Sequence, residues 1–201
     1  MTFQKPAFTR AYRLTFALSL FSFIIGAAFG YGFWQENPEL VKTVLHALLE
    51  QLQELTEKIN RSPWFGQALI IFLNNLRVSS LMIILGGIIP FLPLLITYSN
   101  GMFVGVMAAY IGTNQQITTE AFILGLLPHG AFEIPAFVLA SAVGVVWGTR
   151  NWLKWLDIRK TPGFLENMKN GLSFFPVILV LLFIAALVEV LISPTLLPAP
   201  I

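Results

Sequence analysis

A small set of polar and ionisable residues lies within long apolar stretches of this sequence. The polar and ionisable positions are Asn74, Asn75, Arg77, Asn100, His129, Glu133 and Glu189, and Gly101 directly follows Asn100 as a further candidate. An ionisable side chain at the centre of a bilayer costs about 2.5 to 3.5 kcal/mol on insertion scales, so it normally faces the interior of a helix bundle and has a partner there. We therefore expect these positions to converge in one cluster, in which Arg77 balances a glutamate.

The pair His129 and Glu133 has the most suggestive spacing in this set. Residues four apart share one face of a helix, and Pro128 suits the first turn of such a helix. Pro135 cannot donate a hydrogen bond to the carbonyl of Ala131, which leaves an acceptor beside the pair. With one arginine against two glutamates, either a glutamate is protonated or the histidine is charged, and such a cluster can respond to pH.

Three kinds of chemistry are compatible with the set. Its members can hold helices together by hydrogen bonds, or they can line a pathway for an ion or small solute. His129, Glu133 and Glu189 can also supply one nitrogen and two carboxylates to a metal, although the HxxxE spacing is far less specific than HExxH. The sequence has no GxSxG motif, phosphate-binding glycine loop or cysteine, so it indicates no catalytic residue and no cofactor.

The composition identifies the solvent of this protein. Of the 201 residues, 56% are hydrophobic and 11% are charged, and the mean hydropathy is +0.77. Soluble domains carry about 25% charged residues, so this chain is expected to be an integral membrane protein surrounded by lipids. Its net charge of +2 comes from few groups and does not indicate a surface that binds nucleic acid.

Five apolar segments are long enough to cross about 30 Å of hydrocarbon as helices. They are 14–34, three central spans within 65–148 (about 65–89, 91–112 and 120–148) and 172–193. We expect the turn between the first two central spans at Pro90 and Pro93. Asn100 with Gly101 and Pro128 with Pro135 predict interruptions of helices, and for each proline taken alone a plain kink is the alternative. The sequence thus predicts one all-α membrane domain, a polytopic transmembrane helix bundle with some broken helices.

Two polar segments set the expected topology. In 38–62, leucines and other aliphatic residues fall on one half of a helix and glutamates on the other, which predicts an external amphipathic helix. The 150–171 segment and the N-terminus are rich in lysine and arginine. The positive-inside rule therefore predicts a multi-pass protein of the cell membrane with the N-terminus and the 150–171 loop in the cytoplasm and the C-terminus outside.

Three GxxxG pairs allow helices to approach closely. They are Gly26 with Gly30, Gly101 with Gly105, and Gly144 with Gly148. On this basis we expect a homodimer or a larger homo-oligomer, with the first or the third pair at a contact between subunits.

Four short segments together resemble the stage II sporulation protein M family of polytopic membrane proteins. They are FLNN at 72–75, NG at 100–101, PHGAFEIPA at 128–136 and AALVEVLISP at 185–194. The resemblance implies a membrane protein of bacteria or archaea, in a family whose sporulation members work with peptidoglycan-remodelling partners. It also implies that the family's polar positions are Asn74, Asn75, Asn100, His129, Glu133 and Glu189.

Three functional hypotheses follow from these observations. The first, which we take as the prediction, is a non-enzymatic component of a membrane complex that acts with other envelope proteins in cell-envelope remodelling. The second is a transporter or channel for a small solute, an ion or a lipid, with the buried Asn, His and Glu positions as its pathway. The third is an intramembrane metal-dependent hydrolase.

Overall fold

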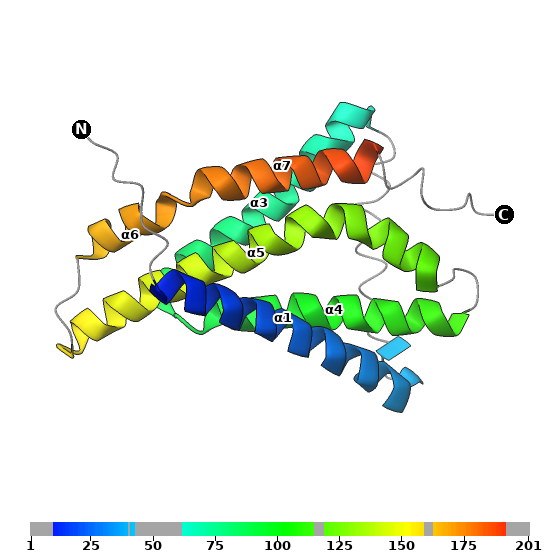
Figure 1. The fold of residues 1–201 in the computed structure, drawn as a ribbon, viewed down its shortest axis with the longest axis horizontal. Coiled ribbons are helices and arrows are strands. Elements are labelled where there is room, and N and C mark those ends of the chain that lie inside the picture. Colours follow the sequence, from blue (N-terminus) through cyan, green and yellow to red (C-terminus); the bar gives the residue numbers. More distant parts are fainter. Residues whose placement is uncertain (1–9, 40, 43–61, 115–118, 159–162, 192–201) are drawn as a thin grey trace.

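The structure, a computed structural model, is a bundle of helices (Figure 1). It describes residues 10–39, 41–42, 62–114, 119–158 and 163–191, with the backbone alone for 114 and 119–129. The helices are α1 (Arg10–Glu36), α3 (Trp64–Ile88), α4 (Leu92–Asn114), α5 (Thr119–Trp155), α6 (Phe164–Leu172) and α7 (Phe175–Leu191), and these described ranges contain no strand. Five segments are long and apolar enough to cross a membrane: α1, α3, α4, α5, and α6 with α7. The predicted all-α membrane bundle is confirmed.

Prolines and their neighbours explain where the helices end and where they continue. The turn between α3 and α4 contains Pro90, which has no N–H to offer to a continuing helix. In contrast, α4 runs unbroken through Asn100 and α5 runs unbroken through Pro128 and Pro135. The helices are therefore not interrupted at these positions, and α5 instead bends in its first half, where its prolines lie, as the kink alternative predicts (Figure 1).

The described helices begin or finish at two ends of the bundle, the basic end and the distal end. The basic end is where α1 begins and α3 and α5 finish, and the distal end is where α3 and α5 begin and α7 finishes (Figure 1). In the predicted loop 150–171, helix α5 continues to Trp155 and α6 occupies Phe164–Leu172, so part of this segment is helical. The predicted amphipathic helix at 38–62 lies largely outside the described residues.

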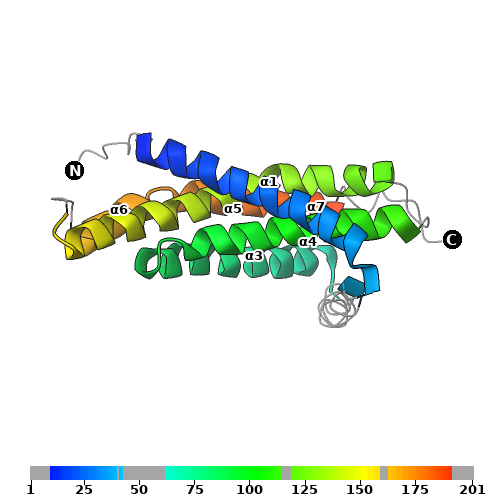
Figure 2. The ribbon, with the colours of Figure 1, turned by 90° about the horizontal axis from the view of Figure 1, so that it is seen from below.

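Helix α5 is the centre of the bundle, and α1, α3, α4 and α7 pack around it (Figures 1 and 2). Its buried residues Ala136, Ala140 and Val143 contact Ile178 and Leu182 of α7 within the main apolar core. A second cluster joins α1 to α4 nearer the distal end and includes the edge-to-face pair of Trp34 and Tyr110. Each of the four outer helices is therefore held in place by contacts with α5 or with another helix that packs on α5.

Glycine lets helix backbones touch at two places. A Cβ atom on Gly26 or Gly30 of α1 would overlap the carbonyl of Tyr98 or Met102 of α4. Gly101 and Gly105 of α4 meet the carbonyls of Phe23 and Ala27 in the same way. Between α3 and α5, a Cβ on Gly86 would lie 2.7 Å from Cα of Gly144, and one on Gly148 would overlap the carbonyl of Gly86.

The three GxxxG pairs therefore serve contacts inside one chain. The expectation that Gly26 with Gly30, or Gly144 with Gly148, forms a contact between subunits is wrong, because the chain's own helices already fill those surfaces. The physical reason is general: a small-residue groove accepts any helix of the right shape, and here the partner helix is in the same polypeptide. The glycine pairs therefore no longer support the expected homo-oligomer, because they were the surfaces expected to form its contacts.

Candidate functional site

One buried face of α3 carries the first part of the predicted polar cluster. Asn75, Ser79, Met82 and Gly86 follow one another at spacings of four, three and four residues, which keeps them on one side of a helix. Asn75 is 7% exposed and Ser79 is fully buried. Since Gly86 touches Gly144, this face of α3 is the one that packs against α5.

Glu133 of α5 lies at the same height as Asn75. Asn75 precedes Gly86 by eleven residues, and Glu133 precedes Gly144 by eleven residues. Gly86 and Gly144 touch, and α3 and α5 run in the same direction (Figure 1). Eleven residues make about three full turns and about 16 Å, so Glu133 also lies on the face of α5 that is turned to α3. The Glu133 side chain is half-buried, and its Oε2 atom is buried.

Glu189 belongs to the buried face of α7 but lies nearer the distal end. It continues the buried series Ile178, Leu182 and Ala185, and its Oε2 atom is buried. The rings of Phe72 in α3 and Phe183 in α7, 5.9 Å apart, set the relative height of these antiparallel helices. Counted from that contact, Glu189 lies about 13 Å closer to the distal end than Asn75 does.

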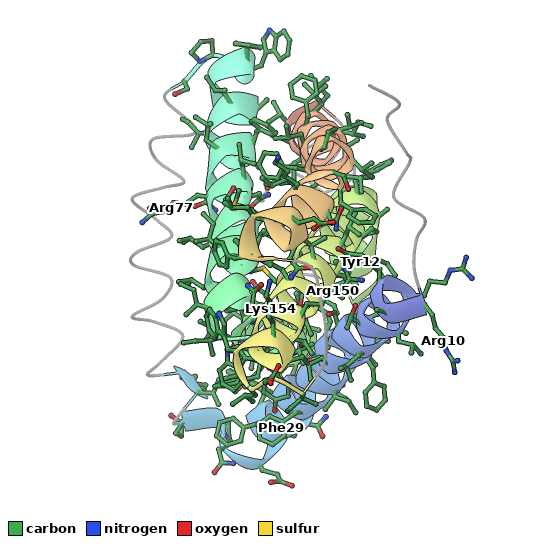
Figure 3. The ribbon with its side chains drawn as sticks, turned by 90° about the vertical axis from the view of Figure 1, so that its left-hand side faces the viewer. Arg10, Tyr12, Phe29, Arg77, Arg150 and Lys154 are labelled. Carbon is green, nitrogen blue, oxygen red and sulfur yellow. The ribbon has the colours of Figure 1, made fainter. Side chains whose placement is uncertain are left out.

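Arg77 lies outside the cluster. It precedes Gly86 by nine residues, which is about half a turn more than two full turns, so it occupies the opposite side of α3. Figure 3 shows its side chain pointing away from the bundle, and the residue is exposed. Asn74 is exposed as well. The expected convergence of Arg77 with the glutamates therefore does not occur within the described residues.

Asn100 and Gly101 lie on another helix, α4. The Nδ2 atom of Asn100 donates to the carbonyl of Ile96, 2.9 Å away, within α4 itself. Gly101 faces the carbonyl of Phe23 in α1. Gly101 therefore belongs to the α1–α4 contact and the hydrogen bond of Asn100 lies within α4, whereas Asn75 belongs to the face of α3 that packs on α5.

The metal hypothesis for His129, Glu133 and Glu189 stays a prediction. His129 lies on α5, four residues before Glu133, but its side chain is outside the described part. Within the side chains that the structure describes, no group of three or more His, Cys, Asp or Glu residues is placed to hold a metal ion.

The sequence did not predict a hydrogen-bonded network at the basic end, in which Asn151 and Asn167 are buried and Trp152 is exposed. The Nδ2 atom of Asn151 donates to the carbonyl of Gly87, 3.0 Å away, and Nδ2 of Asn167 donates to Oδ1 of Asn151 at 3.3 Å. Trp152 donates through Nε1 to the carbonyl of Ile88 at 2.7 Å. The bonds from Asn151 and Trp152 satisfy carbonyls in the last turn of α3, which have no partner within their own helix, and the bond from Asn167 holds the Asn151 side chain.

A signal for this network was present in the sequence. Asn151 follows Gly144 by seven residues and so continues the face of α5 that packs on α3. We overlooked it because the adjacent Arg150 suggested a cytoplasmic loop. Arg150 instead lies over the ring of Tyr12, 5.4 Å from its centre, and joins α5 to α1. Figure 3 shows both residues at the basic end together with Arg10 and Lys154.

Comparisons with known proteins agree with the resemblance found in the sequence. The family model described as Stage II sporulation protein M matches residues 19–194. A protein of Methanocaldococcus jannaschii, described as uncharacterized, is 34% identical over 128 residues, which cover 62% of this chain and 69% of that relative. No solved structure matches the chain.

Proposed function

Because the chain belongs to the stage II sporulation protein M family and has five helices able to span a membrane, we propose that it is a non-enzymatic component of a membrane complex. The observation that carries this proposal is the outward position of Arg77. A charged residue on the outer face of a transmembrane helix needs a partner, and the other described helices pack on the opposite face.

The depth of Arg77 makes the argument quantitative. It is thirteen residues from Trp64 and eleven from Ile88, so it lies about 16 to 20 Å from either end of α3. At such a depth a lone arginine costs about 2.5 to 3.5 kcal/mol on insertion scales. A transmembrane helix of another protein that carries an Asp or Glu at mid-depth would remove this cost and bind specifically.

The surroundings of Arg77 fit a protein contact surface within the membrane. Leu73 and Leu81, four residues before and after it, are 51% and 43% exposed on the same side of α3. A charged residue framed by apolar side chains gives a partner both shape and one specific ion pair. The backbone contacts between α1 and α4 and between α3 and α5 make the rest of the bundle a firm support for this surface.

We also propose an orientation and a setting for the complex. The basic end, with Arg10, Arg150 and Lys154 at the end of the bundle shown in Figure 3, faces the cytoplasm under the positive-inside rule. With all five candidate helices crossing the membrane, the N-terminus would lie in the cytoplasm and the C-terminus outside. The family supports a complex of the cell envelope, with other envelope proteins as partners.

Photo-crosslinking in living cells tests the proposal. A photoreactive amino acid at Leu81 should give an adduct with a membrane protein, and Arg77→Leu should abolish the adduct whereas Arg77→Lys should preserve it. The matched control is Ile24 on α1, which is 54% exposed and has no charged neighbour one turn away. The control position should yield lipid adducts only.

Two results would overturn the proposal. One is an adduct at Leu81 that forms equally well in the Arg77→Leu protein, since the ion pair would then not determine the contact. The other is an adduct that mass spectrometry maps to residues 43–61 of the same chain, because the protein would then cover Arg77 by itself.

A further inference from the structure

Tryptophan residues mark the two ends of α3. Trp64 begins this helix and is 56% exposed, and Trp152 of α5 donates to the carbonyl of Ile88 at its other end. The 25 residues of α3 rise about 36 Å, which covers about 30 Å of hydrocarbon and reaches the headgroups on both sides. Tryptophan is enriched at that boundary. Trp152 therefore lies where hydrocarbon meets headgroups at the basic end.

The end of α5 extends beyond this boundary. Figure 2 shows the last turn of α5 and the start of α6 lying past the start of α1 and the end of α3. Trp155 and Leu156 follow Trp152 by three and four residues, so they share its face of α5 and lie about 5 and 6 Å further along the helix. They are 62% and 64% exposed. An exposed apolar face thus lies at the depth of the lipid headgroups.

A positively charged side chain lies on another side of the same turn. Lys154 follows Arg150 by four residues, so these two residues share a face. Lys154 is exposed, and its Nζ atom is 3.6 Å from the position that a Cβ of Gly163 would take, at the start of α6. Among the described residues its amino group forms no ion pair. Lys154 can therefore bind an anion from outside the chain.

The two ends of the bundle differ in the sign of their charge. At the basic end, basic residues outnumber acidic ones in the described part of the chain, the basic ones being Arg10, Arg13, Arg150, Lys154 and Lys169 and the acidic ones Asp157 and Glu166. At the distal end of α1, the acidic residues Glu36 and Glu39 outnumber Lys42, which pairs with Glu39 at 2.8 Å. Positive charge beside an apolar face at headgroup depth matches an anionic lipid, because the amine binds the phosphate and the apolar face contacts the acyl chains.

We propose that the end of α5 and the start of α6 bind anionic phospholipids, with Lys154 at the phosphate group and with Trp155 and Leu156 against the upper parts of the acyl chains. This surface lies at the end of the bundle, whereas Arg77 lies in the middle of α3, so the proposal does not depend on a partner at Arg77. The cytoplasmic leaflet as the source of the lipid follows from the proposed orientation, whereas the preference for anionic lipid does not depend on it.

Lipid binding to the purified full-length chain in detergent micelles tests the surface. Native mass spectrometry measures the affinity for phosphatidylglycerol and for phosphatidylcholine with the same acyl chains, and we expect phosphatidylglycerol to bind more tightly. Lys154→Gln should weaken binding of phosphatidylglycerol about fivefold, as expected for one lysine near an anionic surface, while Lys154→Arg should retain it. The matched control is Lys42→Gln near the distal end, which should bind as the unchanged protein does.

A second pair of variants tests the apolar face. Trp155→Ala should weaken binding of phosphatidylglycerol several-fold, because the lipid loses a contact with the exposed indole. The matched control is Trp64→Ala, which removes a similarly exposed tryptophan from the other end of α3 and should leave this affinity unchanged. Each variant is first checked for an unchanged elution profile.

Four results would overturn the proposal. Equal affinity for the two lipids would exclude a preference for anionic headgroups, and equal losses in Lys154→Gln and Lys42→Gln would exclude a site at the basic end. Inorganic phosphate that displaces phosphatidylglycerol at matched concentration would show a phosphate site in place of a lipid site. Arg77→Leu should retain the lipid preference even if it loses its crosslinking partner, which separates the two proposals, and loss of the preference in that variant would exclude the assignment to the end of α5.

Discussion

Replacement of Gly30 by alanine should destabilise the bundle, whereas the same replacement at Gly32 should not. Both glycines lie in α1, two residues apart, so the gain in helix propensity of about 0.8 to 1.0 kcal/mol applies equally to both. A Cβ at Gly32 meets nothing within 4 Å, whereas a Cβ at Gly30 overlaps the carbonyl of Met102 in α4. The difference between the two variants therefore isolates the close contact of α1 with α4.

The magnitude follows from how far α4 must move. The carbonyl carbon of Met102 would lie 2.9 Å from the new Cβ, whereas ordinary contacts begin at 3.4 Å. A backbone carbonyl cannot rotate away as a side chain can, so α1 and α4 must separate along a contact that also includes Gly26, Gly101 and Gly105. Overpacking of this kind costs about 1 to 3 kcal/mol. We expect Gly30→Ala to be less stable than Gly32→Ala by that amount.

The assay is unfolding of the purified variants in mixed micelles by increasing SDS, followed by tryptophan fluorescence. Trp34, buried between α1 and α4, reports on this contact. Equal unfolding midpoints for Gly30→Ala and Gly32→Ala would refute the reasoning, because α1 and α4 would then not touch through their backbones. A Gly101→Ala protein, which places a Cβ against the carbonyl of Phe23 from the other helix, should reproduce the effect.

Three further predictions concern the ends of the helices. Cysteines introduced singly at Glu36 and Asp157 should react with an impermeant maleimide from opposite sides of the membrane. The chain has no cysteine of its own, so there is no background labelling. Labelling of both positions from the same side would contradict the five-span topology. Asn151→Ala should lower the free energy of unfolding by about 1 to 3 kcal/mol in the SDS titration, because the buried carbonyl of Gly87 loses its donor, and an unchanged midpoint would exclude that role. Asp157 has a φ of 54°, in the left-handed region that glycine adopts without a steric cost. Asp157→Gly should therefore raise the free energy of unfolding by about 1 to 2 kcal/mol, whereas Asp157→Ala should not. Equal effects of the two substitutions would rule out this backbone explanation.

The predictable part of the fold is the part that hydropathy determines. Five apolar segments and the turn at Pro90 follow from the length and composition of each segment, independently of the others. The prolines of α5 illustrate the limit of local reasoning. Pro128 and Pro135 each remove one backbone donor, and whether the helix then breaks or only bends depends on the neighbouring helices that hold it.

The candidate site was predictable in part. The positions of Asn75 and Glu133 on facing helices follow from equal distances to Gly86 and Gly144, once these two glycines are known to touch. The outward position of Arg77 follows from the same count, but the sequence offers no reason to prefer one face of α3 over the other. Asn151 was missed because its charged neighbour placed it in a loop.

Hydropathy and short motifs were enough to predict a membrane environment, five candidate spans and the family resemblance. These properties depend on short segments taken one at a time, and the hydropathy of an apolar segment does not depend on the helices it packs against. The packing of the helices was needed to establish that the GxxxG pairs join helices of one chain, that Arg77 points outward, and that Ser79 lies on the face of α3 that packs on α5. In a membrane, lipid is as apolar as the buried face of a helix, so hydrophobicity does not select which face is packed inside. Shape decides instead, and shape complementarity exists only when all the helices are together.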